Sequence, residues 1–263
     1  MSLRPSELRV LIDLLPLMEA RVAEAGALVR EAGARMKHSV TVGPAWAHVY
    51  DLSFREHMAL AAVTFDIDRE LIAASKSELP ISALRDLVLQ VDEIELDTEG
   101  MTDEEMTRAA WGGLSLSLSM YNTMRCLMTF GRYINEMLAV AREKNDDKAL
   151  LNAIRVDPTV VGSRTALVRL SRAVLERDSK FLGSVRKAMK GSLTKRQEAN
   201  FQKMRLVVRV LADSGAGRLS DDELVKLFAE ELHLYPEFSK SGDIVKNLRT
   251  FVDRYMKLST TRN

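Results

Sequence analysis

Cysteine is nearly absent from this chain of 263 residues, which contains a single one, Cys126. One cysteine excludes a disulfide within the chain, and so low a count is typical of proteins in a reducing compartment. Cys126 falls in an uncharged stretch, so we expect a buried structural thiol rather than a nucleophile. The first residues also lack the pattern of a secretory signal. We therefore expect a cytoplasmic protein.

Histidine is scarce too, with four in the chain, and the common metal-binding patterns are missing. There is no His-Glu-x-x-His zinc motif and no glycine-rich loop of the kind that cradles phosphate. Glu230 and His233 have the spacing of one half of a helical di-iron site, but such a site requires a second pair. The sequence therefore predicts no metal site, no cofactor and no identifiable catalytic residue.

Long hydrophobic runs are also missing. The stretch between Arg108 and Arg125 carries no charge, but it is shorter than the roughly 20 apolar residues of a membrane span and contains several serines. We expect a buried central helix here and no membrane contact. Its small residues either let another helix approach closely or line a ligand cavity. If they line a cavity, a remote further hypothesis is an enzyme whose helical pocket is formed by Ser115, Ser119, Asn122 and His57.

The chain does contain clear signals for helices. A capping box, in which Ser or Thr is followed three residues later by Glu or Gln, occurs at Ser53, Thr102, Thr194 and Ser220. Apolar residues recur at spacings of three and four after Thr102, as one buried helical face requires. The sequence predicts an all-α, multi-helix bundle of roughly nine to eleven helices around a long central helix of residues 102–144. We expect an N-terminal helical region, 1–145, and a basic C-terminal helical region, 146–263.

Charge is nearly balanced overall, with 38 Lys and Arg against 37 Asp and Glu, but its distribution is uneven. Residues 86–107 contain nine acids and no base, whereas residues 157–210 contain thirteen bases and four acids. The acidic run is either a solvated hinge before the central helix or an electrostatic mask over the basic region. The basic run lies on several expected helices rather than in one tail.

Basic side chains gathered on helices are typical of surfaces that neutralise phosphates. We expect phosphate contacts along the basic run as far as Arg205 and Arg209. The alternative is that these bases are ordinary solvated faces whose aliphatic stems cover the core. The predicted nucleic-acid-binding residues are Arg164, Arg169, Arg172, Arg186, Lys187, Lys190, Lys195, Arg196, Lys246, Asn247 and Arg249.

The C-terminal part of the chain has the order helix, turn, basic helix. A helix over about residues 243–258 carries Lys246, Asn247 and Arg249, and we expect Arg249 to lie outward or oblique on it. This order resembles a DNA-binding helix-turn-helix, in which the second helix contacts the bases. The turn of residues 233–241 is long for the compact form, which leaves a winged-helix-like variant open.

The run from Asn152 to Val161, followed by arginine-rich helices, resembles uncharacterised proteins of bacterial genomes and mobile elements. The resemblance implies no catalytic residue and no function. Three hypotheses stay open. The first is a cytoplasmic nucleic-acid-binding accessory or regulatory protein. The second is a helical scaffold or adaptor that binds a protein partner or its own copy through its acidic and basic segments, and the third is the enzyme described above.

Overall fold

The computed structural model describes residues 4–35, 49–90, 100–190, 199–235 and 244–260, and within these ranges the fold is all-α, as predicted, with no strand. The helices are α1 (Pro5–Arg35), α2 (Phe54–Thr64), α3 (Asp68–Ser75), α4 (Pro80–Gln90), α5 (Asp103–Phe130), α6 (Ile134–Lys144), α7 (Asp147–Val156), α8 (Arg164–Leu175), α9 (Ser179–Lys190), α10 (Ala199–Asp213), α11 (Asp221–Val225) and α12 (Ile244–Thr260). A 3₁₀ turn, η3 (Pro158–Gly162), follows α7, and a π-helical turn, η4 (Lys226–Glu231), follows α11.

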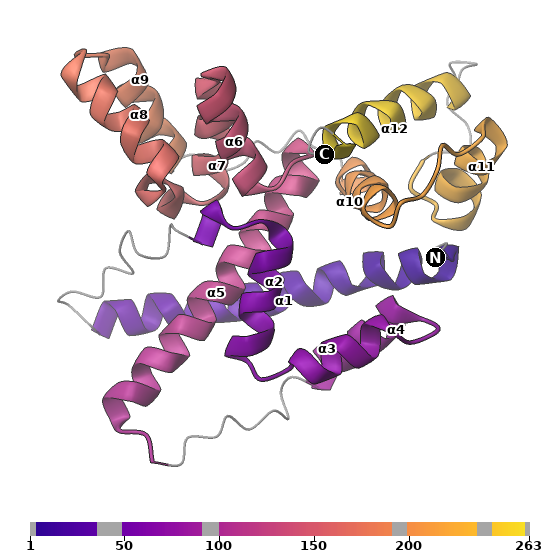
Figure 1. Ribbon diagram of the computed structural model, residues 1–263, viewed down its shortest axis with the longest axis horizontal. Helices are drawn as coiled ribbons and strands as arrows, with labels where there is room; N and C mark the ends of the chain where they lie inside the picture. Colours follow the sequence, from indigo (N-terminus) through magenta and orange to yellow (C-terminus); the bar gives the residue numbers. More distant parts are fainter. Residues whose placement is uncertain (1–3, 36–48, 91–99, 191–198, 236–243, 261–263) are drawn as a thin grey trace.

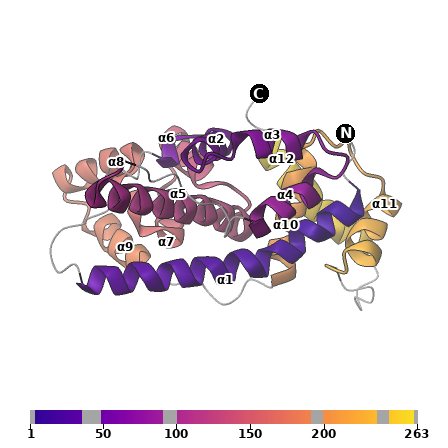
Figure 2. The ribbon, with the colours of Figure 1, turned by 90° about the horizontal axis from the view of Figure 1, so that it is seen from below.

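Two long helices organise the molecule. α1 runs along its length, and α5 crosses α1 near the middle (Figure 1). Figure 2 shows α6 to α9 at one end, here called the α6–α9 lobe, and α10 to α12 at the other, here called the α10–α12 lobe. None of the helices in the described ranges has both the length and the apolar character that a membrane span requires.

Separate hydrophobic cores hold the two lobes. In the α6–α9 lobe, Ile134, Ile154 and Phe181 are buried in one cluster with Cys126 of α5. Cys126 is fully buried, as predicted, and this burial raises the pKa of its thiol well above the ordinary value. In the α10–α12 lobe, the first turns of α1 pack with α10, η4 and α12. The first core includes residues on both sides of residue 145, and the predicted division of the chain at that residue stays a prediction.

Three of the four predicted capping boxes are confirmed, at Ser53, Thr102 and Ser220. At the start of α5 the Thr102 hydroxyl accepts a hydrogen bond from the amide of Glu105 at 3.3 Å. The Glu105 carboxylate accepts one from the amide of Thr102 at 2.9 Å. Free amide donors at the helix end are thereby satisfied, which fixes where α5 begins. The fourth box, at Thr194, lies outside the described residues.

The central helix is shorter than predicted, and its expected extent to residue 144 is wrong. α5 ends at Phe130, and α6 begins at Ile134. Between them Gly131 has a φ of +76°, in the left-handed region that favours glycine, and its amide donates to the carbonyl of Leu127 at 2.7 Å. A Cβ atom at Gly131 would also overlap the ring of Tyr255 in α12. Apolar spacing continues from α5 into α6, so the periodicity alone did not reveal this turn.

Candidate anion-binding site

Helix α8 has two different faces. It begins at the buried Ser163, whose hydroxyl accepts a hydrogen bond from the amide of Ala166 at 3.3 Å. Ala166 and Ala173 are fully buried, and their small side chains let α8 lie close to the core of its lobe. The outer face mixes bases with large apolar side chains, at Arg164, Leu167, Val168, Arg172 and Leu175.

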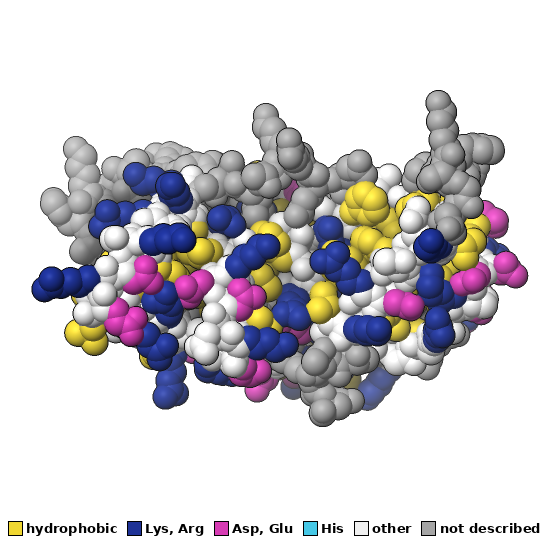
Figure 3. Space-filling view, turned by 90° about the horizontal axis from the view of Figure 1, so that it is seen from above, with side chains coloured by type: hydrophobic (Ala, Val, Ile, Leu, Met, Phe, Trp, Pro, Cys, Tyr) yellow, Lys and Arg dark blue, Asp and Glu magenta, His cyan; other side chains and the backbone are white. Residues whose placement is uncertain are grey.

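Helix α9 has the same division, with more lysine on the outside. Phe181, Val185 and Ala188 are buried. Its exposed side chains include Lys180, Arg186, Lys187 and Lys190. Figure 3 shows Lys and Arg side chains spread over the end of the molecule that α8 and α9 form, with acidic and apolar side chains between them. The three predicted residues of α9, Arg186, Lys187 and Lys190, are therefore at the surface.

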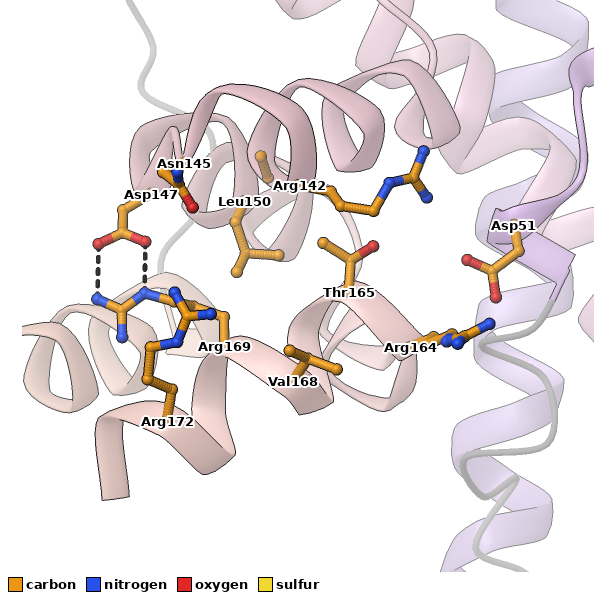
Figure 4. A pocket seen from close by; sticks show the side chains of 11 residues that line it. Asp51, Arg142, Asn145, Asp147, Leu150, Arg164, Thr165, Val168, Arg169 and Arg172 are labelled. Carbon is orange, nitrogen blue, oxygen red and sulfur yellow. Dashed lines mark hydrogen bonds and ion pairs between the residues drawn. The ribbon is translucent and has the colours of Figure 1, made fainter. Parts of the chain in front are cut away.

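A cavity of about 470 Å³ lies between α6, α7 and α8 (Figure 4). Its charged lining consists of four arginines and two aspartates, Arg142, Arg164, Arg169, Arg172, Asp51 and Asp147. The lining therefore carries two more positive than negative charges. Three of the arginines come from α8 and were predicted as binding residues, whereas Arg142 comes from α6 and was not predicted.

Arg169 is engaged within the protein. Its Nε and Nη2 atoms each donate to a carboxylate oxygen of Asp147 at 2.8 Å, and Nη2 also donates to Asp178 at 2.9 Å. The guanidinium lies 3.8 Å from the ring centroid of Phe181. A hydrogen bond from the Phe181 amide, together with Arg169, holds the pKa of Asp178 below its ordinary value. Arg169 thus joins α7, α8 and α9 and shapes one wall of the cavity.

The other three arginines are available to a ligand. Arg164 and Arg172 are exposed and have no hydrogen-bonded or ion-paired partner among the described residues. Arg142 pairs with Glu143 at 3.3 Å, but the two side chains are 63% and 62% exposed. Exposed pairs of this kind contribute little, so a ligand can displace Glu143 at low cost.

The available groups divide the cavity into two polar ends and an apolar middle (Figure 4). Arg142, Arg164, the hydroxyl of Thr165 and the Asp51 carboxylate lie toward one end, and Arg172 lies at the other. The apolar middle is formed by Leu150 and Val168. Guanidinium groups donate in a planar fork that matches carboxylate and phosphate oxygens, so the cavity can hold an anion.

No protein-family model, curated protein or solved structure matches this chain. Its candidate function therefore depends on the chemistry of the side chains that the fold brings together. The cavity between α6, α7 and α8 is the candidate site, because it combines a partly open recess with cationic groups, Arg164 and Arg172, that have no partner within the described ranges.

The two arginines of α10 are not available for phosphate, and the expectation that the contact surface extends to them is wrong. Arg205 donates to the carbonyl of Met128 at 2.7 Å and to the hydroxyl of Tyr255 at 2.9 Å. Arg209 donates to Glu136 at 2.9 Å and to Asp213 at 2.8 Å, and its side chain is 12% exposed. These bonds hold α10 against α5, α6 and α12.

Arg249 of α12, expected to lie outward or oblique, is half-buried and is paired within the protein. Arg249 donates to Asp221 from Nε at 3.0 Å and to the carbonyl of Leu219 at 2.7 Å, so it ties α12 to the start of α11. Lys246 and Asn247 are exposed. α11 has five residues and continues into the π-helical turn η4, and residues 236–243 lie outside the described ranges. The helix-turn-helix resemblance therefore stays a prediction.

Two residues of the enzymatic hypothesis meet in the interior. His57 of α2 and Ser119 of α5 are hydrogen bonded at 2.8 Å, and both are buried. The Ser119 hydroxyl donates to the carbonyl of Leu116 and so accepts from His57, whose pKa is lowered by burial. Asn122 donates instead to Asp157 at 2.8 Å. The His57–Ser119 pair joins α2 to α5 inside the protein and does not line the cavity described above.

Some predicted features lie outside the described residues. These are Lys195, Arg196 and residues 91–99, which include most of the acids of the run 86–107. The hypothesis that this acidic run masks the basic region therefore stays a prediction. Asp103, Glu104 and Glu105 of that run lie in the first turn of α5, where the positive end of the helix stabilises their negative charges. Among the described residues, no three His, Cys, Asp or Glu side chains are grouped as metal ligands.

Proposed function

We propose that the protein is a cytoplasmic nucleic-acid-binding protein with an accessory or regulatory role, and that α8 and α9 form its contact surface. The supporting observation is the arginine-lined cavity beside the exposed bases of α9, in which Arg164 and Arg172 have no partner among the described residues. Such guanidinium groups can donate to phosphate oxygens without first breaking an ion pair.

The position of these bases on packed helices favours binding. α8 and α9 share the core of the α6–α9 lobe, so their backbones are already ordered before a ligand arrives. Binding then costs mainly the freedom of the side chains, and release of counterions from the nucleic acid drives it. The exposed bases of the surface are Arg164, Arg172, Arg177, Lys180, Arg186, Lys187 and Lys190.

A helical scaffold or adaptor is the second candidate, and one observation favours it. Leu167, Val168 and Leu175 on the outer face of α8 are 46%, 57% and 84% exposed. Apolar side chains grouped at a surface and bordered by charges are typical of protein interfaces. A partner of this face would bury these three residues and place acidic groups against Arg164 and Arg172.

Fluorescence anisotropy with labelled duplex DNA, single-stranded DNA and RNA tests the first candidate. The double variant Arg164→Ala/Arg172→Ala should weaken binding by about tenfold or more, because each arginine donates charge-assisted hydrogen bonds. The matched control is Arg69→Ala/Lys76→Ala, which removes two exposed bases from the α3 region, away from the proposed surface.

Equal binding by the two double variants would contradict the proposal that α8 contacts nucleic acid. Absence of binding to all three ligands by the wild-type protein would favour the scaffold. In that case Leu167→Ser/Leu175→Ser should abolish capture of a protein partner, or self-association measured by light scattering, and Arg69→Ala/Lys76→Ala should not.

A further inference from the structure

We propose that the cavity between α6, α7 and α8 binds a terminal phosphate monoester, at the end of a nucleic-acid strand. This inference rests on the proposed function and adds to it a specificity for strand ends. The residues that carry it are Arg142, Arg164 and Thr165 at one end of the cavity and the apolar pair Leu150 and Val168 beside them.

The shape of the site favours a strand end over the middle of a strand. Its volume of about 470 Å³ falls in the range of about 300–1,000 Å³ that small-molecule pockets occupy. An internal phosphodiester continues into the chain on both sides and has to lie along a surface. A terminal phosphate continues on one side, so it can enter a recess while the strand follows α8 and α9 outside.

The charge of the lining favours a monoester. A phosphate monoester carries about −1.5 to −2 charges at pH 7, whereas each internal phosphodiester of a strand carries one. Arg169 is paired with Asp147 and Asp178, and Arg142 is paired with Glu143. Arg164 and Arg172 are the lining arginines without a partner among the described residues, and the Asp51 carboxylate also lines the cavity. Cationic side chains attract a dianion more strongly than a monoanion, so this lining favours a terminal phosphate over an internal one.

The donors at one end suit the geometry of a phosphate. Arg142 and Arg164 come from different helices and lie toward the same end of the cavity, where Thr165 adds a hydroxyl (Figure 4). Arg164 and Thr165 are the first two residues of α8, so the positive end of that helix also favours an anion there. Val168, which is 57% exposed, then offers an apolar surface to the sugar and base of the terminal nucleotide, and the buried Leu150 lies beneath it.

The test compares oligonucleotides of one sequence that end in a 5′-phosphate, a 3′-phosphate or hydroxyl groups, by anisotropy with the wild-type protein. At least one phosphorylated end should bind about tenfold more tightly than the hydroxyl-ended strand. Arg142→Ala/Arg164→Ala should remove this difference. Because Arg164 also belongs to the proposed contact surface, the hydroxyl-ended strand should bind more weakly too, and the ratio between the phosphorylated and hydroxyl-ended strands is the quantity that decides. The control Lys187→Ala/Lys190→Ala should weaken all three strands by the same factor. Circular dichroism checks that each variant is folded.

The outcomes separate this inference from the proposed function. Equal binding of all three strands would overturn the terminal-phosphate site and leave nucleic-acid binding in place. A nucleoside monophosphate and inorganic phosphate serve as competitors. Calorimetric binding of the monophosphate that depends on Arg142 and Arg164, without binding of any strand, would support the phosphate site and overturn the nucleic-acid function. A difference between the ends that persists in Arg142→Ala/Arg164→Ala would also overturn the site.

Discussion

Two sets of arginines in the described part of the chain have different surroundings. Arg164 and Arg172 on α8 are exposed and have no partner among the described residues. Arg205, Arg209 and Arg249 on α10 and α12 each donate to two groups elsewhere in the protein. The two sets differ in the acceptors that packing brings to them, and Arg169 of α8, which donates to Asp147 and Asp178, belongs with the second set. Charge that is already paired stabilises the fold, and charge that is unpaired is available for binding.

The largest expected effect is the loss of stability when a paired arginine, Arg209, is replaced. Arg209 and Glu136 are 12% and 10% exposed, so Arg209→Ala leaves a nearly buried carboxylate without its cation. Such a loss costs about 3–5 kcal/mol in the free energy of unfolding. Urea denaturation followed by circular dichroism measures it, with Arg172→Ala as the matched control. Arg172→Ala should change stability by less than about 0.5 kcal/mol. Equal losses in the two variants would contradict the difference between the two sets.

Charge reversal on α9 should give the next largest effect, on binding. Arg186→Glu/Lys187→Glu replaces two exposed bases with acids, so phosphates are repelled where they were attracted. We expect an approximately hundredfold loss of nucleic-acid affinity at low salt, equal to about 2.7 kcal/mol, and little change in unfolding. Anisotropy titrations measure the affinity. Unchanged affinity would place the contact surface away from α9.

A smaller effect is expected at Arg249, which separates a structural from a binding role for α12. Arg249 is 19% exposed but its partner Asp221 is 57% exposed, so solvent screens the pair. Arg249→Ala should lower the free energy of unfolding by about 1 kcal/mol, mainly through the lost hydrogen bonds, and leave nucleic-acid affinity within about twofold. Lys246→Ala is the control on the same helix. A tenfold loss of nucleic-acid affinity in either variant would instead support contact between α12 and the bases of the nucleic acid.

The smallest effect is a pH dependence at His57, away from both sets of arginines. Burial lowers the pKa of His57 in the folded protein, so the unfolded chain binds a proton at a higher pH than the folded chain. Stability is then complete above the ordinary value of 6.5 and decreases as the pH falls below it. Thermal unfolding between pH 7 and 5 should show this decrease, and His57→Gln should reduce it. A stability that rises as the pH falls would contradict the assignment.

Local signals in the sequence predict most of the fold. The capping boxes at Ser53, Thr102 and Ser220 each begin a helix, because the residues that satisfy the free amides lie within one turn. α8 begins at Arg164, where the Ser163 hydroxyl caps it, so a local residue again sets the start of a helix. The break at Gly131 was missed, because the overlap with Tyr255 depends on a residue more than a hundred positions away.

The site could be predicted in part. Arg164 and Arg172 could be identified because the excess of bases over acids is visible within one stretch of the sequence, residues 157–210. Arg142 was missed, since it joins the cavity through the packing of α6 on α8. The pairing of Arg209 with Glu136 was missed for the same reason, because 73 positions separate the two residues. Sequence gives the number of bases, and the tertiary structure determines which of them remain unpaired.

The most direct test of the central claim is the salt dependence of nucleic-acid binding by the wild-type protein and by Arg164→Ala/Arg172→Ala. For duplex DNA the logarithm of the affinity falls by about 0.9 for each phosphate contact per logarithm of salt concentration. Loss of two contacts should therefore make the slope shallower by about 1.8, and Arg69→Ala/Lys76→Ala should keep the wild-type slope. Identical slopes for all three proteins, or binding that does not respond to salt, would contradict the claim that the unpaired bases of α8 and α9 bind phosphate.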